Sequence, residues 1–172
     1  LVYNSYMNDS QRQQVEAYLN YKWFGIGSAN NVLPTTTAVT VNAGATLDLN
    51  GADQEVTGLS GAGSLTLGAA TLTVNSTADT SFSGAISGEG SLVKTGANKL
   101  AITGANTFSG GTTVTGGTLE GNATSLPTDV TLSNGATLSL NQTVAGTFSK
   151  DVSGEGAFVK TGNGVLGLLG SL

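Results

Sequence analysis

The motif FSGAISGEGSLVKTG, residues 82–96, recurs as FSKDVSGEGAFVKTG at residues 148–162, with ten of the fifteen positions identical. Shorter echoes surround the two copies: SGAGSL at residues 60–65, and GATLDLN at 44–50, which returns as GATLSLN at 135–141. Self-similarity of this kind marks a repeat architecture, in which each unit buries its apolar face against its neighbours. The sequence therefore predicts a solenoid.

The spacing of the copies indicates the length of one coil. The intervals from Gly88 to Gly154, from Gly44 to Gly135 and from Gly61 to Gly88 fit roughly three, four and one turns of about 22 residues, with some insertions. Since each rung adds about 4.8 Å along the axis, about six rungs from residue 32 onward would form a rod of roughly 30 Å, with the copies on successive coils.

Short strands account for most of the chain after Pro34. Apolar and small polar residues alternate there in runs that Gly, Asn and Asp interrupt, which is the period of a strand with one buried face. Stacking of these runs would place Val, Leu and Ile in columns inside the coil, with Phe82, Phe108, Phe148 and Phe158 inside it or under its turns. The expected strands are 39–41, 46–49, 64–67, 71–74, 100–102, 112–114, 130–132 and 137–140.

Residues 1–31 have a different pattern. Apolar residues recur at helical spacing from Asn8 to Trp23, polar residues at 8–10 can cap the helix, and Gly25 and Gly27 end it. The apolar stripe must pack on something, either the end of the solenoid or a domain that precedes it. We therefore predict two regions: a strand and helix segment at 1–31, serving as a cap or as the end of a lectin-like domain, and a β-helix repeat domain at 32–172.

The first segment also carries a short motif. Residues 1–4 (LVYN) suit a last strand, and residues 18–23 (YLNYKW) suit the end of the helix that follows it. This order resembles the close of bacterial concanavalin-like (laminin-G-like) jelly-roll domains. The likeness covers about 25 residues, too few for a jelly roll, so no sugar-binding residue is carried over. It implies a lectin-like domain upstream in the parent chain.

Composition excludes several classes of function. Six Lys and Arg residues against eleven acids provide no basic stripe for a phosphate backbone. Cysteine and histidine are absent, which removes disulfides, thiolate sites and histidine catalysis. No apolar run reaches the ~18 to 20 residues that span a bilayer, and residues 1–4 lack the order of a signal peptide. We expect no nucleic-acid partner, no membrane insertion within this segment, and a chain cut from a longer one.

A longer motif runs from Gly88 to Leu119. SGEG and VKTG are followed by a Leu-x-Ile strand and then by GANTFSGGTTVTGGTL at 104–119. A second copy starts at Gly154, with Gly167 and Leu169 in place of small polar residues. In this full form the motif is similar to the passenger-associated strand repeat of bacterial autotransporters. The resemblance implies a right-handed parallel β-helix, secretion to or beyond the cell surface, and roles in adhesion or display, but no reaction.

The repeated charges are poor candidates for catalysis. Glu89 and Glu155, with Lys94 and Lys160, occupy equivalent positions in the two copies. Three rungs would separate equivalent residues by about 14 Å. A catalytic carboxylate pair needs about 5 to 10 Å. We therefore interpret these residues as parts of structural turns.

A polysaccharide lyase on the same fold would need clustered aspartates for calcium and a basic residue as the base. The acids that lie close in sequence are Asp48, Asp53, Glu55 and Asp79, and the only arginine is Arg12, in the helical segment. Calcium-binding repeats of the form Gly-Gly-x-Gly-x-Asp do not occur in the sequence. These observations argue against a lyase.

The sequence thus predicts an all-β chain, a right-handed parallel β-helix (β-solenoid) with a short N-terminal α-helix. We expect a non-catalytic structural or adhesive segment at a bacterial surface, with no catalytic residue, metal or cofactor. Its partner would be a ligand or glycan on a host or neighbouring cell, or further copies stacked end to end through the apolar run 165–169. The alternatives are a carbohydrate-binding module, a polysaccharide-degrading β-helix, and ice binding by Thr-rich strands such as 71–73.

Overall fold

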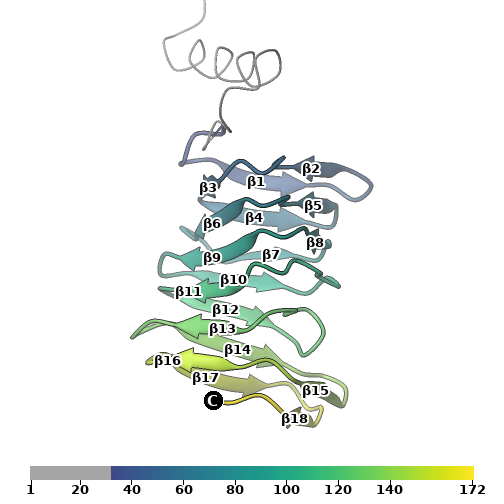
Figure 1. Ribbon diagram of the computed structural model, residues 1–172, viewed down its shortest axis with the longest axis vertical. Helices are drawn as coiled ribbons and strands as arrows, with labels where there is room; N and C mark the ends of the chain where they lie inside the picture. Colours follow the sequence, from purple (N-terminus) through teal and green to yellow (C-terminus); the bar gives the residue numbers. More distant parts are fainter. Residues whose placement is uncertain (1–31) are drawn as a thin grey trace, which may run out of the picture.

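The computed structural model describes residues 32–172, which form a parallel β-solenoid whose strands stack along one axis (Figure 1). The helix expected at 8–23, the strand at 1–4 and the jelly-roll likeness lie outside the described residues. The strands are β1 (Ala38–Val41), β2 (Thr46–Asp48), β3 (Gln54–Val56), β4 (Gly58–Gly61), β5 (Ser64–Thr66), β6 (Thr71–Asn75), β7 (Thr80–Phe82), β8 (Ile86–Ser87), β9 (Ser91–Thr95), β10 (Lys99–Ile102), β11 (Thr112–Val114), β12 (Thr118–Gly121), β13 (Val130–Leu132), β14 (Thr137–Asn141), β15 (Gly146–Phe148), β16 (Val152–Gly154), β17 (Ala157–Thr161) and β18 (Leu166–Leu168). All eight strands expected from the sequence are confirmed.

The strands form three faces, which the chain visits in the order A, B, C on each turn. Face A is the seven-stranded sheet β1-β4-β7-β10-β12-β14-β17, and face C is the six-stranded sheet β3-β6-β9-β11-β13-β16. Face B consists of β2-β5-β8 and, further along, β15-β18. Between these two parts, the loops 103–111 and 122–129 replace the face B strand on two turns. Every described strand pair is parallel.

The seven strands of face A give about seven turns, one more than the expected number of about six. The turns differ in length. Hydrogen bonds from one turn to the next join Asp53 to Thr71, a sequence separation of 18, and Asp129 to Asp151, a separation of 22. The handedness of the coil stays a prediction.

The two long copies of the motif lie on different faces. Residues 82–96 run through β7, β8 and β9, on faces A, B and C, whereas residues 148–162 run through β15, β16 and β17, on faces B, C and A. From the first copy to the second, the chain therefore makes three full turns and advances by one further face. The prediction that the copies are separated by whole turns is wrong, because the repeated unit is a strand, a corner and a strand rather than a complete coil.

One corner conformation recurs at all three edges of the rod. Gly61 joins face A to face B, Gly88 joins B to C, and Gly154 joins C to A, with φ of +107°, +115° and +102°. A side chain is strained at such φ, so glycine is required. The N–H of the residue after each glycine donates a hydrogen bond to a carbonyl of the preceding turn. These bonds join Ala62 to Val41 (3.0 Å), Glu89 to Gly68 (2.7 Å) and Glu155 to Leu132 (3.0 Å). The same local sequence can therefore form the turn at any of the three edges of the rod.

The core consists of columns of side chains that the strand register aligns. On face A, Leu100, Leu119, Leu138 and Phe158 follow one another in consecutive turns. Phe82, Phe108 and Phe148 are at most 1% exposed, which confirms their predicted burial. Phe158 is only partly buried, since it lies in the last turn of face A.

One polar residue interrupts this column. Thr80 pairs with Leu100 on face A, and its Oγ1 is buried without a hydrogen-bond partner among the described residues. A buried hydroxyl without a partner loses its hydration and gains nothing in return. Thr80 therefore destabilises the column that contains it.

Replacing this hydroxyl by a methyl group should stabilise the rod. We expect Thr80→Val to raise the free energy of unfolding by about 1 kcal/mol, measured from urea denaturation. Thr40→Val is the matched control, because the Thr40 hydroxyl is exposed and bonded to Ser60 (2.8 Å). A decrease in stability for Thr80→Val would show that the Thr80 hydroxyl has a partner.

Candidate functional site

The acids that a lyase would need do not gather at one site: Asp48, Asp53 and Glu55 lie along the first turn, and Asp79 lies at the corner before β7. Asp48 Oδ1 accepts the N–H of Asn50 (2.8 Å), Asp53 Oδ1 accepts that of Thr71 (2.7 Å), and Glu55 Oε1 accepts the side-chain amide of Asn75 (3.3 Å). Within residues 32–172, no three His, Cys, Asp or Glu side chains gather in a way that could hold a metal ion. These acids hold backbone and side chains in place.

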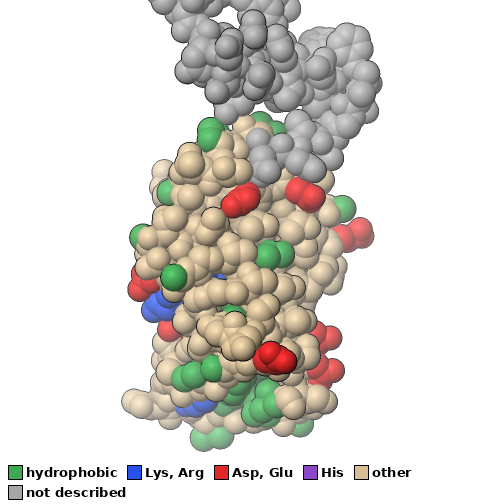
Figure 2. Space-filling model, turned by 90° about the vertical axis from the view of Figure 1, so that its left-hand side faces the viewer, with side chains coloured by type: hydrophobic (Ala, Val, Ile, Leu, Met, Phe, Trp, Pro, Cys, Tyr) green, Lys and Arg blue, Asp and Glu red, His purple; other side chains and the backbone are tan. Residues whose placement is uncertain are grey.

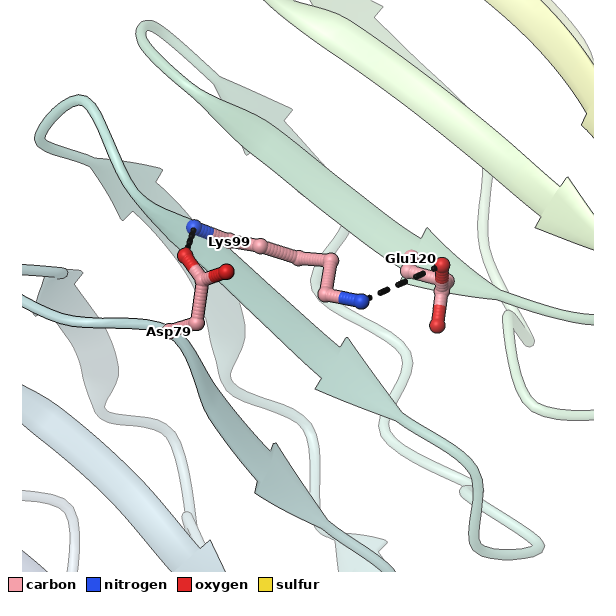
Figure 3. Close-up of polar contacts among 3 residues, drawn as sticks. All are labelled: Asp79, Lys99 and Glu120. Carbon is pink, nitrogen blue, oxygen red and sulfur yellow. Dashed lines mark hydrogen bonds and ion pairs between the residues drawn. The ribbon is translucent and has the colours of Figure 1, made fainter.

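Corner aspartates repeatedly clamp one turn to the next. In the described chain Asp53, Asp79, Asp129 and Asp151 each accept a backbone N–H from a residue 18 to 22 positions later. Figure 3 shows one example that continues over three turns: Asp79 accepts the N–H of Lys99 (2.8 Å), and Lys99 Nζ lies 3.5 Å from Glu120 Oε2. Since the Lys99 side chain is 40% exposed, this ion pair contributes at most about 1 kcal/mol.

Glu89 and Glu155 are exposed on different edges of the rod. Glu89 follows β8, at the corner from face B to face C, and Glu155 lies between β16 and β17, at the corner from C to A. They do not form the stacked pair that a catalytic interpretation would require. The backbone N–H of each donates a hydrogen bond to a carbonyl of the preceding turn.

Lys94 is inside the rod, so its interpretation as a turn residue is wrong. It occupies an inward position of β9, stacked between Val74 and Val114, and is 0% exposed. Its Nζ donates to the carbonyls of Thr95 (2.6 Å), Gly96 (3.0 Å) and Gly116 (3.1 Å), the last one turn further on. The alternation of Leu92 and Lys94 in one strand was the sequence signal for burial.

Lys160 repeats part of this arrangement in the second copy. It stacks on Leu140 of face A, and its Nζ donates to the carbonyl of Gly162, as Lys94 does to Gly96. In both copies, therefore, the lysine of the VKTG motif turns back under the corner that follows it. Lys160 is exposed because it lies in the last turn of face A.

Burial lowers the pKa of Lys94 to about 8, and the negative charge of Asp79 partly opposes this effect. Because the folded pKa is below the unfolded value of 10.5, the unfolded chain binds more protons between about pH 8 and 10.5. The free energy of unfolding therefore rises with pH in this window.

A variant without this amine should lose that pH dependence. Relative to Lys94→Met, we expect the wild-type chain to gain on the order of 3 kcal/mol of stability between pH 7 and pH 10.5. Urea denaturation at both pH values measures this difference. Lys160→Met, which removes the exposed lysine of the second copy, is the matched control. Equal pH dependence of wild type and Lys94→Met would contradict a desolvated Lys94.

Where face B is interrupted, side-chain amides continue its hydrogen-bond ladder. Asn106 is 5% exposed; its Oδ1 accepts the N–H of Ile86 (2.8 Å), and its Nδ2 donates to the carbonyl of Ser125 (2.7 Å). Thr107 N–H also donates to the Ile86 carbonyl (2.8 Å). Asn106 thus bridges three consecutive turns that have no continuous strand ladder on face B.

The interruption leaves a polar groove of about 500 Å³ along the corner between faces B and C. It extends over three turns, and its charged residues are Asp129 and Lys150. Sequence analysis missed this groove; its only signal was the length of the segment between the strands at 100–102 and 112–114. The lining consists of Thr107, Phe108, Ser109, Gly110, Gly111, Pro127, Thr128, Asp129 and Lys150.

Exposed apolar side chains gather at one end of the rod. Figure 2 shows hydrophobic side chains concentrated at the lower end, whereas charged ones are scattered over the face in view. The largest exposures include Val144 (70%), Val165 (74%), Leu169 (78%) and Leu172 (68%). Nowhere in residues 32–172 is there a helix long and apolar enough to cross a membrane.

Comparison with known proteins identifies a transport repeat in the chain. The passenger-associated-transport-repeat family model matches residues 92–120, which run from within β9 to within β12 and include the first loop of the groove. The chain is also similar to the Adhesin BmaC autotransporter of Brucella suis biovar 1 (strain 1330), with 48% identity over 85 residues. This match covers 45% of the chain and 2% of the adhesin, so the chain spans a small part of that relative. No solved structure matches the chain significantly.

Proposed function

We propose that this chain is a non-catalytic, extracellular segment of an autotransporter-type passenger, and that its rod displays an adhesive surface at the bacterial cell. The observation that carries the proposal is the passenger-associated transport repeat built into a continuous solenoid. The similarity to an autotransporter adhesin supports the same conclusion.

The physical properties of the rod suit display. Each turn contacts only its neighbours, so turns add length and surface without a larger core. The acids near residues 48–79 bond to backbone or amide groups, which argues against a lyase. An ice-binding face would need threonine on nearly every rung, but one outward column of face C reads Glu55, Thr73, Val93, Thr113, Thr131 and Ser153.

Adhesion and catalysis can be measured on the same protein. We expect beads coated with the full chain to bind host-cell monolayers saturably, while the chain releases no new sugar ends from a panel of acidic polysaccharides. An Asp48→Asn, Asp53→Asn double variant should adhere equally well, because the proposed function assigns these carboxylates no contact with a partner. Depolymerisation by the wild type that this variant loses would overturn the non-catalytic assignment, and absence of adhesion would overturn the adhesive one.

The last turn also supports a proposal of end-to-end stacking. Strands β17 and β18 are the last members of their sheets, and no further strand of the described chain covers their outer edges, beside Val165 and Leu169. An open edge of this kind templates pairing with another strand. Its partner would be a neighbouring rung of the same polypeptide or another copy.

Stacking between copies predicts concentration-dependent assembly. We expect the sedimentation coefficient of the chain to rise with concentration, and Leu169→Lys to suppress this rise by placing a charge at the apolar end. Thr113→Lys, which adds the same charge to the side of the rod, should leave assembly unchanged. A monodisperse monomer at high concentration would contradict stacking between copies.

A further inference from the structure

The groove between faces B and C is held in shape by hydrogen bonds within the rod. The buried hydroxyls of Thr112 and Thr128 lie 2.8 Å apart, and Asn122 Oδ1 accepts the N–H groups of Thr124 and Ser125 (both 2.9 Å). Asn106 holds the opposite loop to the neighbouring turns. A ligand would therefore bind without the cost of ordering these loops.

The groove offers both hydrogen-bond donors and acceptors. Lys150 is partly buried, and its ammonium has no hydrogen bond or ion pair within residues 32–172. Asp129 is exposed and uses Oδ1 to accept the N–H of Asp151 (3.0 Å). Thr107 and Ser109 add two exposed hydroxyls. Groups that need both donors and acceptors, such as sugar hydroxyls, match this lining.

The balance of charge favours a neutral ligand. The charges of Lys150 and Asp129 cancel, and no other charged residue of the described chain lines the groove. An acidic ligand would therefore meet a carboxylate as well as an ammonium and would gain no net electrostatic attraction. A cationic ligand would place its charge near Lys150. Uncharged hydroxyls instead form charge-assisted hydrogen bonds to both side chains.

The shape of the lining favours a glycan over a peptide. Phe108 is 1% exposed, so the groove has no open aromatic pocket for a peptide side chain. Gly110 and Gly111 form a strip of bare backbone, and a Cβ at Gly111 would have no atom within 4 Å. Pro127, half-buried, supplies a small apolar surface for the C–H face of a sugar ring. The volume of about 500 Å³ lies within the range of small-ligand sites.

We propose that this groove binds a short segment of an uncharged, hydroxyl-rich glycan, with Lys150 donating to its oxygens and Asp129 accepting from its hydroxyls. The inference rests on the adhesive function proposed above and names the site and the ligand class through which the rod would adhere.

The test is binding of the full chain to an array of neutral, acidic and amino-sugar oligosaccharides, with affinities then measured by calorimetry. We expect binding to at least one neutral oligosaccharide, with an affinity that changes less than about twofold between about 50 and 300 mM NaCl, because no net charge is neutralised. Lys150→Met should weaken this binding about tenfold or more, the effect of losing one charge-assisted hydrogen bond.

Two further variants keep the outcome interpretable. Asp129→Asn retains an acceptor for the Asp151 N–H, so it should fold normally and still weaken binding. Lys99→Met removes a lysine from face A, away from the groove, and should bind like the wild type. Urea midpoints close to the wild-type value establish that each variant is folded.

Several results would overturn the groove as a glycan site. These are binding only to acidic sugars or peptides, unchanged affinity in Lys150→Met and Asp129→Asn, or no binding to any neutral glycan. If coated beads still adhere to cells in any of these cases, the adhesive function stands and only the groove assignment fails. If the beads do not adhere while the groove binds a neutral glycan, the groove assignment stands and the adhesive function fails.

Discussion

Every strand of this rod is hydrogen-bonded to a strand one turn before it, one turn after it, or both. The pairs are parallel and keep an in-register stack over about seven turns, so each turn serves as the template for the next. The requirement is strict at the corners, where backbones approach closely: a Cβ added at Gly84 would lie 1.7 Å from the carbonyl oxygen of Gly63. Glycine spacing and strand register are therefore two consequences of one constraint.

The same constraint explains the unusual polar residues. Where a face loses its strand, Asn106 supplies an acceptor and a donor in place of the missing backbone groups. Where a lysine enters a column, its ammonium bonds to three carbonyls, and the low-polarity surroundings lower its pKa. Where the chain turns, aspartates accept N–H groups from the next turn. Much of the polar chemistry thus maintains the stack, whereas in the groove the ammonium of Lys150 remains available to a partner.

Sequence reasoning predicted the local structure well. Alternating apolar residues identified eight strands, and the aromatic residues at 82, 108 and 148 are buried as expected. It failed on the number of turns and on Lys94. Offsets between copies were divided into whole turns, although the copies stand on different faces, and a charged residue beside a turn motif was assigned to the turn. The first error is not visible in the pattern, because period two does not say which face a strand joins. For Lys94 the alternation with Leu92 did indicate an inward position, but the pattern does not show which carbonyls lie within reach of its ammonium.

The amino-acid sequence by itself determined that the chain forms short strands joined by glycine corners and stacked as a solenoid, because strand period and positive φ are local properties of a few residues. Only the tertiary structure decided which face each copy of the repeat occupies, the contact of Lys94 with the next turn and the existence of the groove. Each of these depends on which residues meet across a separation of 18 to 22 positions. That separation changes from turn to turn, and only the stacking of the actual turns sets its value.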